Sequence, residues 1–391
     1  MSYHDLGLFI AFIAVVAALL YRDRRKVKLQ GVMFIRRTQK GIDFIHSITD
    51  PMPRFWNFLG TLGIIICIPA LIIGSLFLAG NAVAITQGVQ QEGVRLVLPA
   101  PTGEANIQPG FLFLPWWIWL IGILSVVVPH ELFHGIMCRT ERIRIKSVGW
   151  VLLAIIPGAF VEPDEKQLKK ARRSVKLKVY AAGSFANLLI AGIMLLVMLF
   201  SFNVLFQPSG AAFVANETSV FGKNLSGFIL SIDGNEIKNT QEFRRILAQY
   251  NPGDTVSIVV AENVRFMPRI NTANFVTGVG MVDQSNVTVY QVILQERPDS
   301  GGPYLGVLVP QVDGVKRNDA SFSLYSLFFW VFVLNFGIGI VNILPIKPLD
   351  GGLFFEEIVG RFTKNTKMVV KSVSIFVAAL LIFNLLGPVF L

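Results

Sequence analysis

Charged residues are scarce in this 391-residue sequence: they make up 15% of it, whereas hydrophobic residues make up 53%. Soluble globular domains usually contain about 25% charged residues, so the composition indicates a protein embedded in a lipid bilayer. The net charge of +10 does not indicate a nucleic-acid partner. The Lys and Arg residues cluster at the ends of hydrophobic runs, as topology signals do, and no basic stretch carries interleaved aromatic residues.

Cysteine and histidine are also rare. The two cysteines, Cys67 and Cys138, each lie in a hydrophobic run, which predicts packing residues rather than a disulfide. Of the four histidines, His4 and His46 lie in peripheral segments, while His130 and His134 share one short motif inside a hydrophobic run. A histidine-containing site is therefore expected at that motif.

Six hydrophobic runs match the roughly 20 residues that a helix needs to cross a bilayer, although the first is marginal in length. They are residues 6–21, 55–79, 111–138, 179–202, 324–344 and 368–391. The basic connections 22–40, 139–146, 166–178 and 361–371 can all lie on one side, which the positive-inside rule makes the cytoplasmic side. The predicted fold class is an all-α polytopic membrane protein with about six transmembrane helices.

Two stretches fit neither a span nor a simple loop. Residues 81–114 mix polar residues with short strand-like pieces, and residues 148–161 are apolar but too short to cross a bilayer. Irregular backbone at membrane depth is tolerated only against protein or a wet cavity. Both stretches are therefore expected to be re-entrant or membrane-associated strands near a site, or else ordinary loops packed on the surface.

The segment between the fourth and fifth runs, residues 204–321, has nearly balanced charge and is expected on the outer side. Strand-like runs and one helical pattern, separated by turn signals, predict a small α+β domain. The strand-like runs are 227–232, 255–260, 290–294 and 305–309, and the helical pattern is 240–250. The predicted organisation is a two-span region (1–110), the first part of a catalytic core (111–203), the outer domain (204–321) and the second part of the core (322–391).

The sequence His130-Glu131-Leu132-Phe133-His134 carries the strongest chemical signal. Residues four apart share one face of a helix, so both imidazoles can point at one metal ion. Glu131 is offset by one position, where it can reach a water on the metal without being a ligand. Ionisable residues inside a span are expensive and usually functional, but two histidines satisfied by neighbouring helices are the alternative.

A catalytic zinc site needs three protein ligands and one open position. Asp350 follows the fifth run on a backbone broken by proline and glycine, at the same membrane level as the two histidines. Alone it could be a turn residue; combined with the histidine motif it is the leading third ligand. In the fourth run, Asn187 either bonds another helix or donates to the oxyanion of a tetrahedral intermediate.

Three motifs in this order resemble those of the site-2 protease family of intramembrane metalloproteases: HELFH (130–134), GSFAN (183–187) and NILPIKPLDGG (342–352). The resemblance covers residues 111 to 355. It implies that His130, His134 and Asp350 hold one zinc ion per chain. It also implies that Glu131 is the catalytic base and that Asn187 stabilises the intermediate.

The resemblance extends to candidate substrate-binding residues. Gly158 and Phe160 lie in a segment similar to one beside the family's active site, where it either pairs with an extended substrate or forms a simple turn. Asn342 and Pro345 belong to the third motif. The outer domain resembles a PDZ module, which would place Gly227 and Phe228 at a peptide-binding sheet edge.

Together these features predict an intramembrane zinc metalloendopeptidase that hydrolyses peptide bonds within transmembrane helices. The expected substrates are membrane proteins that another protease has already shortened. The active site is expected near the cytoplasmic face and the PDZ-like domain outside. One alternative is a metal transporter, which should carry polar residues at several depths, whereas here they gather at one level. A second alternative is a relative without protease activity that binds membrane partners, which the presence of Glu131 disfavours.

Overall fold

The computed structural model describes residues 7–390 apart from 8, 11, 15–17, 19–20, 23–26, 32, 89–93, 101–105, 109, 154–155, 216–218, 222–224, 263, 272–274, 298–300 and 311. The chain forms two compact units. The first comprises Met1–Ile193 and Trp330–Leu391, and the second comprises Met194–Phe329.

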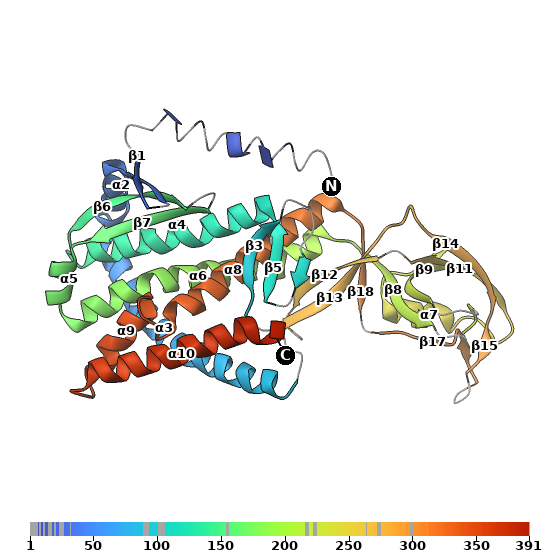
Figure 1. The fold of residues 1–391 in the computed structure, drawn as a ribbon. Helices are drawn as coiled ribbons and strands as arrows, with labels where there is room; N and C mark the ends of the chain where they lie inside the picture. Colours follow the sequence, from blue (N-terminus) through green and yellow to red (C-terminus); the bar gives the residue numbers. More distant parts are fainter. Residues whose placement is uncertain are drawn as a thin grey trace. The chain divides into compact units, whose positions relative to one another are not determined.

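Five helices in the described part of the chain are long and hydrophobic enough to span a bilayer (Figure 1). They are α3 (Pro53–Thr86), α4 (Trp116–Thr140), α6 (Arg173–Leu205), α8 (Asp319–Ile343) and α10 (Thr366–Phe390). Only 17% to 33% of the most hydrophobic window of each helix is buried, so most of this apolar surface faces outward. Such surface is stable against lipid rather than water, which makes the chain a multi-pass membrane protein.

These five helices correspond to five of the six predicted spans. The predicted first span, 6–21, lies largely outside the described residues. The predicted third span began too early, because Phe111–Pro115 forms the strand β5 and the helix α4 starts only at Trp116.

The prediction of an all-α membrane region is wrong, because the first unit contains two sheets. One has four strands in the order β1-β2-β6-β7, and the other has three in the order β3-β5-β4. The strands are β1 (Val27–Gln30), β2 (Met33–Arg37), β6 (Ile145–Leu153), β7 (Ile156–Pro163), β3 (Leu96–Ala100), β4 (Asn106–Gln108) and β5 (Phe111–Pro115). Much of the described part of the two stretches that fitted no span thus forms strands, whose backbone hydrogen bonds are satisfied in sheets, as an apolar setting requires.

The described part of the first unit also contains the shorter helices α2 (Gln39–Thr49), α5 (Glu165–Lys170) and α9 (Asp350–Val359). The amphipathic helix α2 buries Ile42 and Ile45 in a hydrophobic cluster with Ile136 and Met137 of α4. Asp164 caps α5, because its carboxylate accepts hydrogen bonds from two backbone N–H groups of the first turn. This capping lowers the pKa of Asp164, chiefly through the hydrogen bond from the Gln167 backbone.

The second unit is built on a nine-stranded sheet with the main order β12-β13-β18-β8-β9-β11-β14, and β10 and β17 pair with β9 and β8. Its strands are β8 (Pro208–Ala215), β9 (Leu225–Ile232), β10 (Asn235–Glu236), β11 (Thr255–Ala261), β12 (Val264–Asn271), β13 (Phe275–Val282), β14 (Thr288–Ile293), β17 (Val307–Leu308) and β18 (Asp313–Lys316). The short strands β15 (Gln295–Glu296) and β16 (Pro303–Tyr304) form a separate pair. Alternate residues of β11, including Val256, Ile258 and Val260, enter the core, as a half-buried strand requires.

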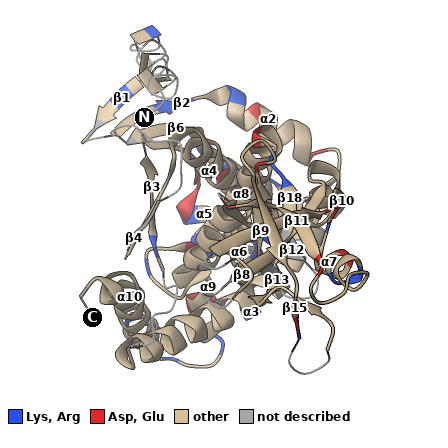
Figure 2. Ribbon diagram, turned by 90° about the vertical axis from the view of Figure 1, so that its right-hand side faces the viewer, with Lys and Arg blue, Asp and Glu red and all other residues tan. Residues whose placement is uncertain are grey.

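One helix of this unit, α7 (Thr240–Leu247), is capped by Asn239 and carries acidic and basic residues on its outer side (Figure 2). It lies inside the predicted helical stretch 240–250, and the predicted strand runs overlap β9, β11, β14 and β17. The strands β12 and β13 pair antiparallel and extend the sheet. The sheet is therefore larger than the small module expected, and the likeness to a PDZ module stays a prediction.

Candidate metal centre

The two histidines of the HELFH motif lie on one face of α4. Their Nε2 atoms are 3.2 Å apart, as expected for side chains one helical turn from each other. His134 donates a hydrogen bond from Nδ1 to the backbone carbonyl of Val179 on α6, at 2.8 Å. Because Nδ1 then carries the proton, the Nε2 atom of neutral His134 presents a lone pair to the centre of the group.

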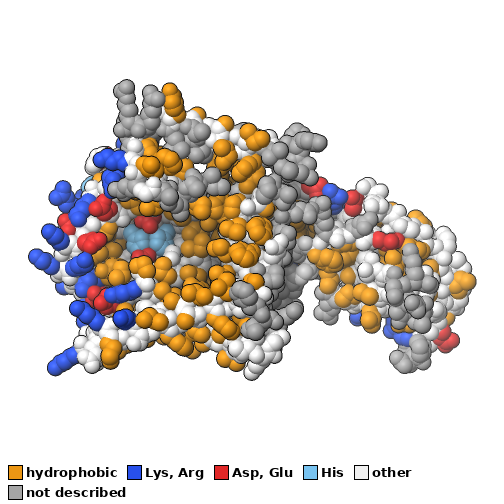
Figure 3. Space-filling view, viewed as in Figure 1, with side chains coloured by type: hydrophobic (Ala, Val, Ile, Leu, Met, Phe, Trp, Pro, Cys, Tyr) orange, Lys and Arg blue, Asp and Glu red, His pale blue; other side chains and the backbone are white. Residues whose placement is uncertain are grey.

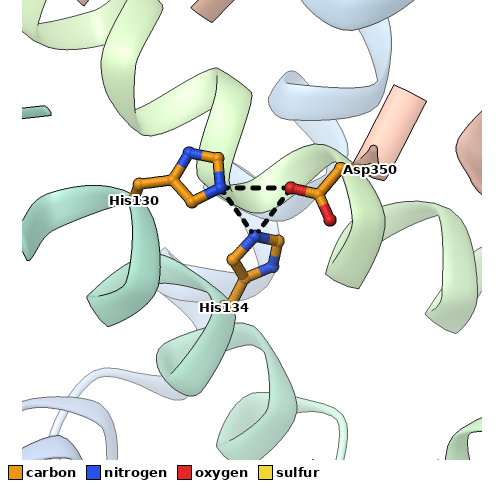
Figure 4. Close-up of side chains that lie close together, drawn as sticks. All are labelled: His130, His134 and Asp350. Atoms are coloured by element: carbon orange, nitrogen blue, oxygen red, sulfur yellow. Dashed lines mark hydrogen bonds and ion pairs between the residues drawn. The ribbon is translucent and has the colours of Figure 1, made fainter. Parts of the chain in front are cut away.

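Asp350 reaches the same point from the far end of the sequence. Its Oδ2 atom lies 3.1 Å from Nε2 of His130 and 3.0 Å from Nε2 of His134 (Figure 4). Asp350 is the first residue of α9, which follows the tight loop after α8. The next residue must be glycine, because a Cβ on Gly351 would lie 2.1 Å from the backbone of Ile343.

The loop before Asp350 is also held by α10. Ser374 donates a hydrogen bond from Oγ to the Pro345 carbonyl at 2.8 Å and accepts one from the Lys347 backbone N–H at 3.3 Å. Ser374 is largely buried. The carboxylate is thus presented by a loop whose backbone polar groups are satisfied from a neighbouring helix.

The geometry fits a zinc ion. Two imidazole nitrogens and one carboxylate oxygen are a donor set typical of catalytic zinc, which leaves the fourth position for water or substrate. Tetrahedral ligands with bonds of about 2.0–2.1 Å are separated by roughly 3.3 Å, close to the 3.0–3.2 Å between these atoms. Between 11% and 23% of each of these side chains is exposed, so the group is largely shielded but not sealed.

Helix α6 forms a wall of this centre. A Cβ placed on Gly183 would lie 2.4 Å from Nε2 of His130 and 2.5 Å from Nε2 of His134. Such distances do not occur between real atoms, so only glycine leaves room for the imidazoles at this position. The space that a side chain of residue 183 would fill adjoins the Nε2 atoms of both histidines.

Glu131 lies next to the metal-binding group but outside it. Its Oε2 atom accepts a hydrogen bond of 2.9 Å from the backbone N–H of Val161 in β7. Among the described strands β7 pairs with β6 alone, so the other edge of β7 and the Glu131 carboxylate lie side by side. A carboxylate held in this way is available as a proton acceptor beside an extended peptide.

Asn187 is completely buried, and its side-chain amide contacts the other side of the His130 ring. The distance from Nδ2 of Asn187 to Nδ1 of His130 is 3.2 Å. Asn187 on α6 therefore forms a hydrogen bond with His130 on α4. A hydrogen bond to another helix is one of the two roles that the sequence left open for Asn187.

The other predicted site residues are placed differently. Gly158 and Phe160 lie in the edge strand β7, half-buried, while Asn342 is in the last turn of α8 and Pro345 is in the loop before Asp350. These four belong to the same unit as the metal-binding group.

Gly227 and Phe228 belong to the second unit and are not part of that group. They lie in β9, which is paired with β8 on one side and β11 on the other. Phe228 is buried in a hydrophobic cluster. Neither residue offers the open strand edge that the predicted peptide-binding role requires.

The sequence pointed to Asn187 on α6 but not to the way this helix supports both histidines. Val179, Gly183 and Asn187 are spaced by four residues, so they form one stripe on the helix. In this stripe the Val179 carbonyl accepts a hydrogen bond from His134, and the Asn187 amide contacts His130. Gly183 leaves the space that both imidazoles occupy. The four-residue spacing was the available signal, but it acquires meaning only once α6 is known to pack against α4.

The surface around the centre is mostly hydrophobic. Figure 3 shows histidine side chains visible from outside, with acidic and many hydrophobic side chains around them. Lys and Arg side chains gather at the nearby end of the first unit, where α5 lies.

Comparisons with known proteins agree with this chemistry. A family model described as "Peptidase family M50" matches residues 118–385, which include all three metal-binding residues and Glu131. The chain is 25% identical over 349 residues to "Uncharacterized protein MJ0971" of Methanocaldococcus jannaschii, which covers 88% of this chain and 82% of that protein. It is 23% identical over 294 residues to "Putative zinc metalloprotease CPE1693" of Clostridium perfringens, which covers 61% of this chain and 86% of that protein.

The family match spans more than half of the chain and confirms the resemblance drawn from the three motifs. The chain therefore belongs to peptidase family M50, the family of the site-2 metalloproteases.

Proposed function

We propose that this protein is an intramembrane zinc endopeptidase that hydrolyses peptide bonds within transmembrane segments of other membrane proteins. The observation that carries the proposal is the convergence of His130, His134 and Asp350 among membrane-spanning helices, with Glu131 one residue away. A metal centre among membrane-spanning helices is accessible to protein segments that lie in the bilayer. The substrates proposed are transmembrane helices, already shortened by another protease.

The zinc ion, when bound by these three residues, supplies a Lewis acid and lowers the pKa of a bound water to about 7. The side chains of the protein itself hold and transfer protons in the reaction. Glu131 accepts the proton of the attacking water and passes it to the leaving amine. The hydrogen bond from the Val161 N–H fixes the Glu131 carboxylate while it waits for substrate.

The edge strand β7 supports a role in presenting the peptide. A peptide bond in a helix is buried in its own hydrogen-bond ladder, so the substrate must unwind before it can be attacked. An unwound segment needs new partners for its backbone groups, because unpaired groups are costly in an apolar setting. We propose that it pairs with β7 along Gly158 and Phe160, which would place it beside Glu131.

We further propose that the centre lies toward the cytoplasmic side. The basic residues of α5 and of the start of α6 lie at the same end of the first unit as the metal-binding group (Figure 3). The positive-inside rule assigns such an end to the cytoplasm. Cleavage there would release the cytoplasmic part of a substrate, as transmembrane signalling or the clearance of membrane remnants requires.

The test is cleavage of a panel of single-span membrane proteins by the purified full-length chain in lipid vesicles. Glu131→Gln should retain zinc but lose at least about 100-fold in turnover, since a side-chain amide cannot accept the proton and general-base catalysis contributes about 10²–10⁴-fold. Glu165→Gln is the matched control, because Glu165 is exposed on α5, away from the metal ligands. Equal cleavage by the Glu131→Gln variant and the native chain would refute the proposal.

A further inference from the structure

The amide of Asn187 is placed in a way that the reaction described so far does not use. Asn187 is fully buried in α6, and its Nδ2 atom faces Nδ1 of His130 at 3.2 Å. Its Oδ1 atom is buried and has no hydrogen-bond partner among the described residues. A buried amide oxygen without a donor is costly, so the arrangement calls for a physical explanation.

The direction of the Asn187–His130 hydrogen bond decides whether His130 can bind metal. If Nδ2 of Asn187 donates to Nδ1, the single proton of neutral His130 must sit on Nε2. That atom is the one that faces His134 and Asp350. A protonated ring nitrogen has no lone pair for a metal, so this direction excludes His130 as a ligand.

A half-turn of the amide about the Cβ–Cγ bond exchanges oxygen and nitrogen without changing the outline of the side chain. Oδ1 then accepts a hydrogen bond from the Nδ1–H of His130. The same rotation gives the buried oxygen a donor and leaves Nε2 of His130 with a lone pair. We infer that Asn187 is a positioning residue: its Oδ1 holds His130 in the tautomer and ring orientation that bind zinc through Nε2.

The other histidine of the centre supports this inference. His134 also uses Nδ1 to donate to an acceptor on α6, in its case the carbonyl of Val179. Val179 and Asn187 are two helical turns apart on one stripe of that helix. Helix α6 thus offers one acceptor to each histidine of α4, which is how proteins commonly orient metal-binding imidazoles.

Packing keeps the Asn187 side chain against His130. A Cβ on Gly339 of α8 would lie 3.2 Å from Cβ of Asn187, so the backbone of α8 closes the opposite side. The inference rests on the proposed zinc site. It differs from the role implied by the family resemblance, in which the Asn187 amide donates to the oxyanion of the substrate.

The two roles make opposite predictions for zinc affinity. The experiment is to titrate the purified full-length chain, in detergent, with a chromophoric zinc chelator as competitor. Asn187→Leu keeps the size of the side chain but removes the acceptor, and it should bind zinc about 10–100-fold more weakly. Asn187→Asp restores an acceptor for Nδ1–H and should bind zinc within a few-fold of the native affinity.

Asn335→Leu is the matched control. Asn335 is likewise fully buried in a membrane helix, but its amide donates to Ser125 and to the Val331 carbonyl rather than to a histidine. This variant should keep the native zinc affinity. A merely structural role for a buried asparagine would show equally in both leucine variants.

Each outcome decides the inference. Native zinc affinity in Asn187→Leu together with lost turnover would overturn it and favour the oxyanion role. Loss of zinc from Asn187→Asp, which can only accept, would also overturn it, and this holds even if Asn187→Leu does not fold. Failure of the native chain to bind zinc, measured first, would instead refute the proposed function.

Discussion

The substitution Gly183→Ala tests most directly whether the centre has the geometry described. The added Cβ would lie 2.4 Å from both Cε1 and Nε2 of His130 and 2.5 Å from Nε2 of His134. Non-bonded heavy atoms settle at about 3.5–4.0 Å, so the imidazoles and α6 must separate by roughly 1 Å. The obstacle is two histidine rings held at both ends, by α4 and by hydrogen bonds to α6, rather than the mobile tip of a flexible side chain.

A movement of 1 Å is large for a metal site, where ligand distances are fixed to within about 0.2 Å. Loss of a residue that only orients a ligand typically reduces metal affinity by about 10–100-fold. Gly183→Ala displaces the ligands themselves, so we expect a reduction of at least about 100-fold. Peptidase activity should fall in proportion to zinc occupancy.

The assay is zinc affinity of the purified variant, from chelator competition with metal content checked by mass spectrometry. Gly192→Ala is the control, because Gly192 lies on the same helix and a Cβ there would meet no atom within 4 Å. It should bind zinc as the native chain does. Native zinc affinity in Gly183→Ala would show that α6 does not pack against the imidazoles, and the proposed role of Asn187 would fall with it.

Two further predictions concern the ligands and the topology. The native chain should contain about one zinc per molecule, and His134→Ala should lose most of it, because three ligands complete a single site; full occupancy in this variant would refute the assignment. A cysteine at Asn286 should react with a membrane-impermeant thiol reagent from outside, and one at Lys169 only from the cytoplasmic side. The native Cys67 and Cys138 are buried, so background labelling should be low, and the reverse pattern would invert the topology.

The membrane helices could be predicted because hydropathy reports directly on lipid contact. The predicted run 55–79 lies inside α3, which extends from Pro53 to Thr86. The ends were missed because a helix continues past the hydrocarbon core into surroundings where polar residues are tolerated. Membrane-associated strands were one expectation for residues 81–114 and 148–161, but the pairing of the four-stranded sheet was beyond this reasoning, since β2 and β6 pair residues more than a hundred positions apart.

Residues 111–115 show the same limit at short range. An apolar run of aromatic and aliphatic residues has no period that separates a helix from a buried strand. Phe111–Pro115 is a strand because it pairs with β3 on one side and β4 on the other. Pro115 then stands directly before α4, at a position where proline does not interrupt a helical hydrogen bond.

The ligand residues were predictable from chemistry, whereas their surroundings were not. Histidines four apart and a carboxylate on a glycine-rich turn are recognisable as donors wherever they occur. On helix α6 the sequence singled out Asn187, but residue type alone did not reveal the acceptor at the Val179 carbonyl or the space at Gly183. The role of this helix depends on which face it turns toward α4, and that face is set by tertiary packing.

Different helices supply the ligands of the centre and the groups that orient those ligands. Helices α4 and α9 supply the ligands, and α6 supplies an acceptor for each histidine together with the space between them. Zinc affinity falls when either a ligand or the group that orients a ligand is lost, but loss of the orienting group lowers the affinity less. Substitutions at Gly183 and Asn187 should therefore weaken zinc binding to different degrees, whereas Val179 acts through its backbone carbonyl, which a change of side chain leaves in place. Changes to outward-facing residues of α6, such as Phe200→Leu, should leave zinc affinity unchanged, because Phe200 is 77% exposed.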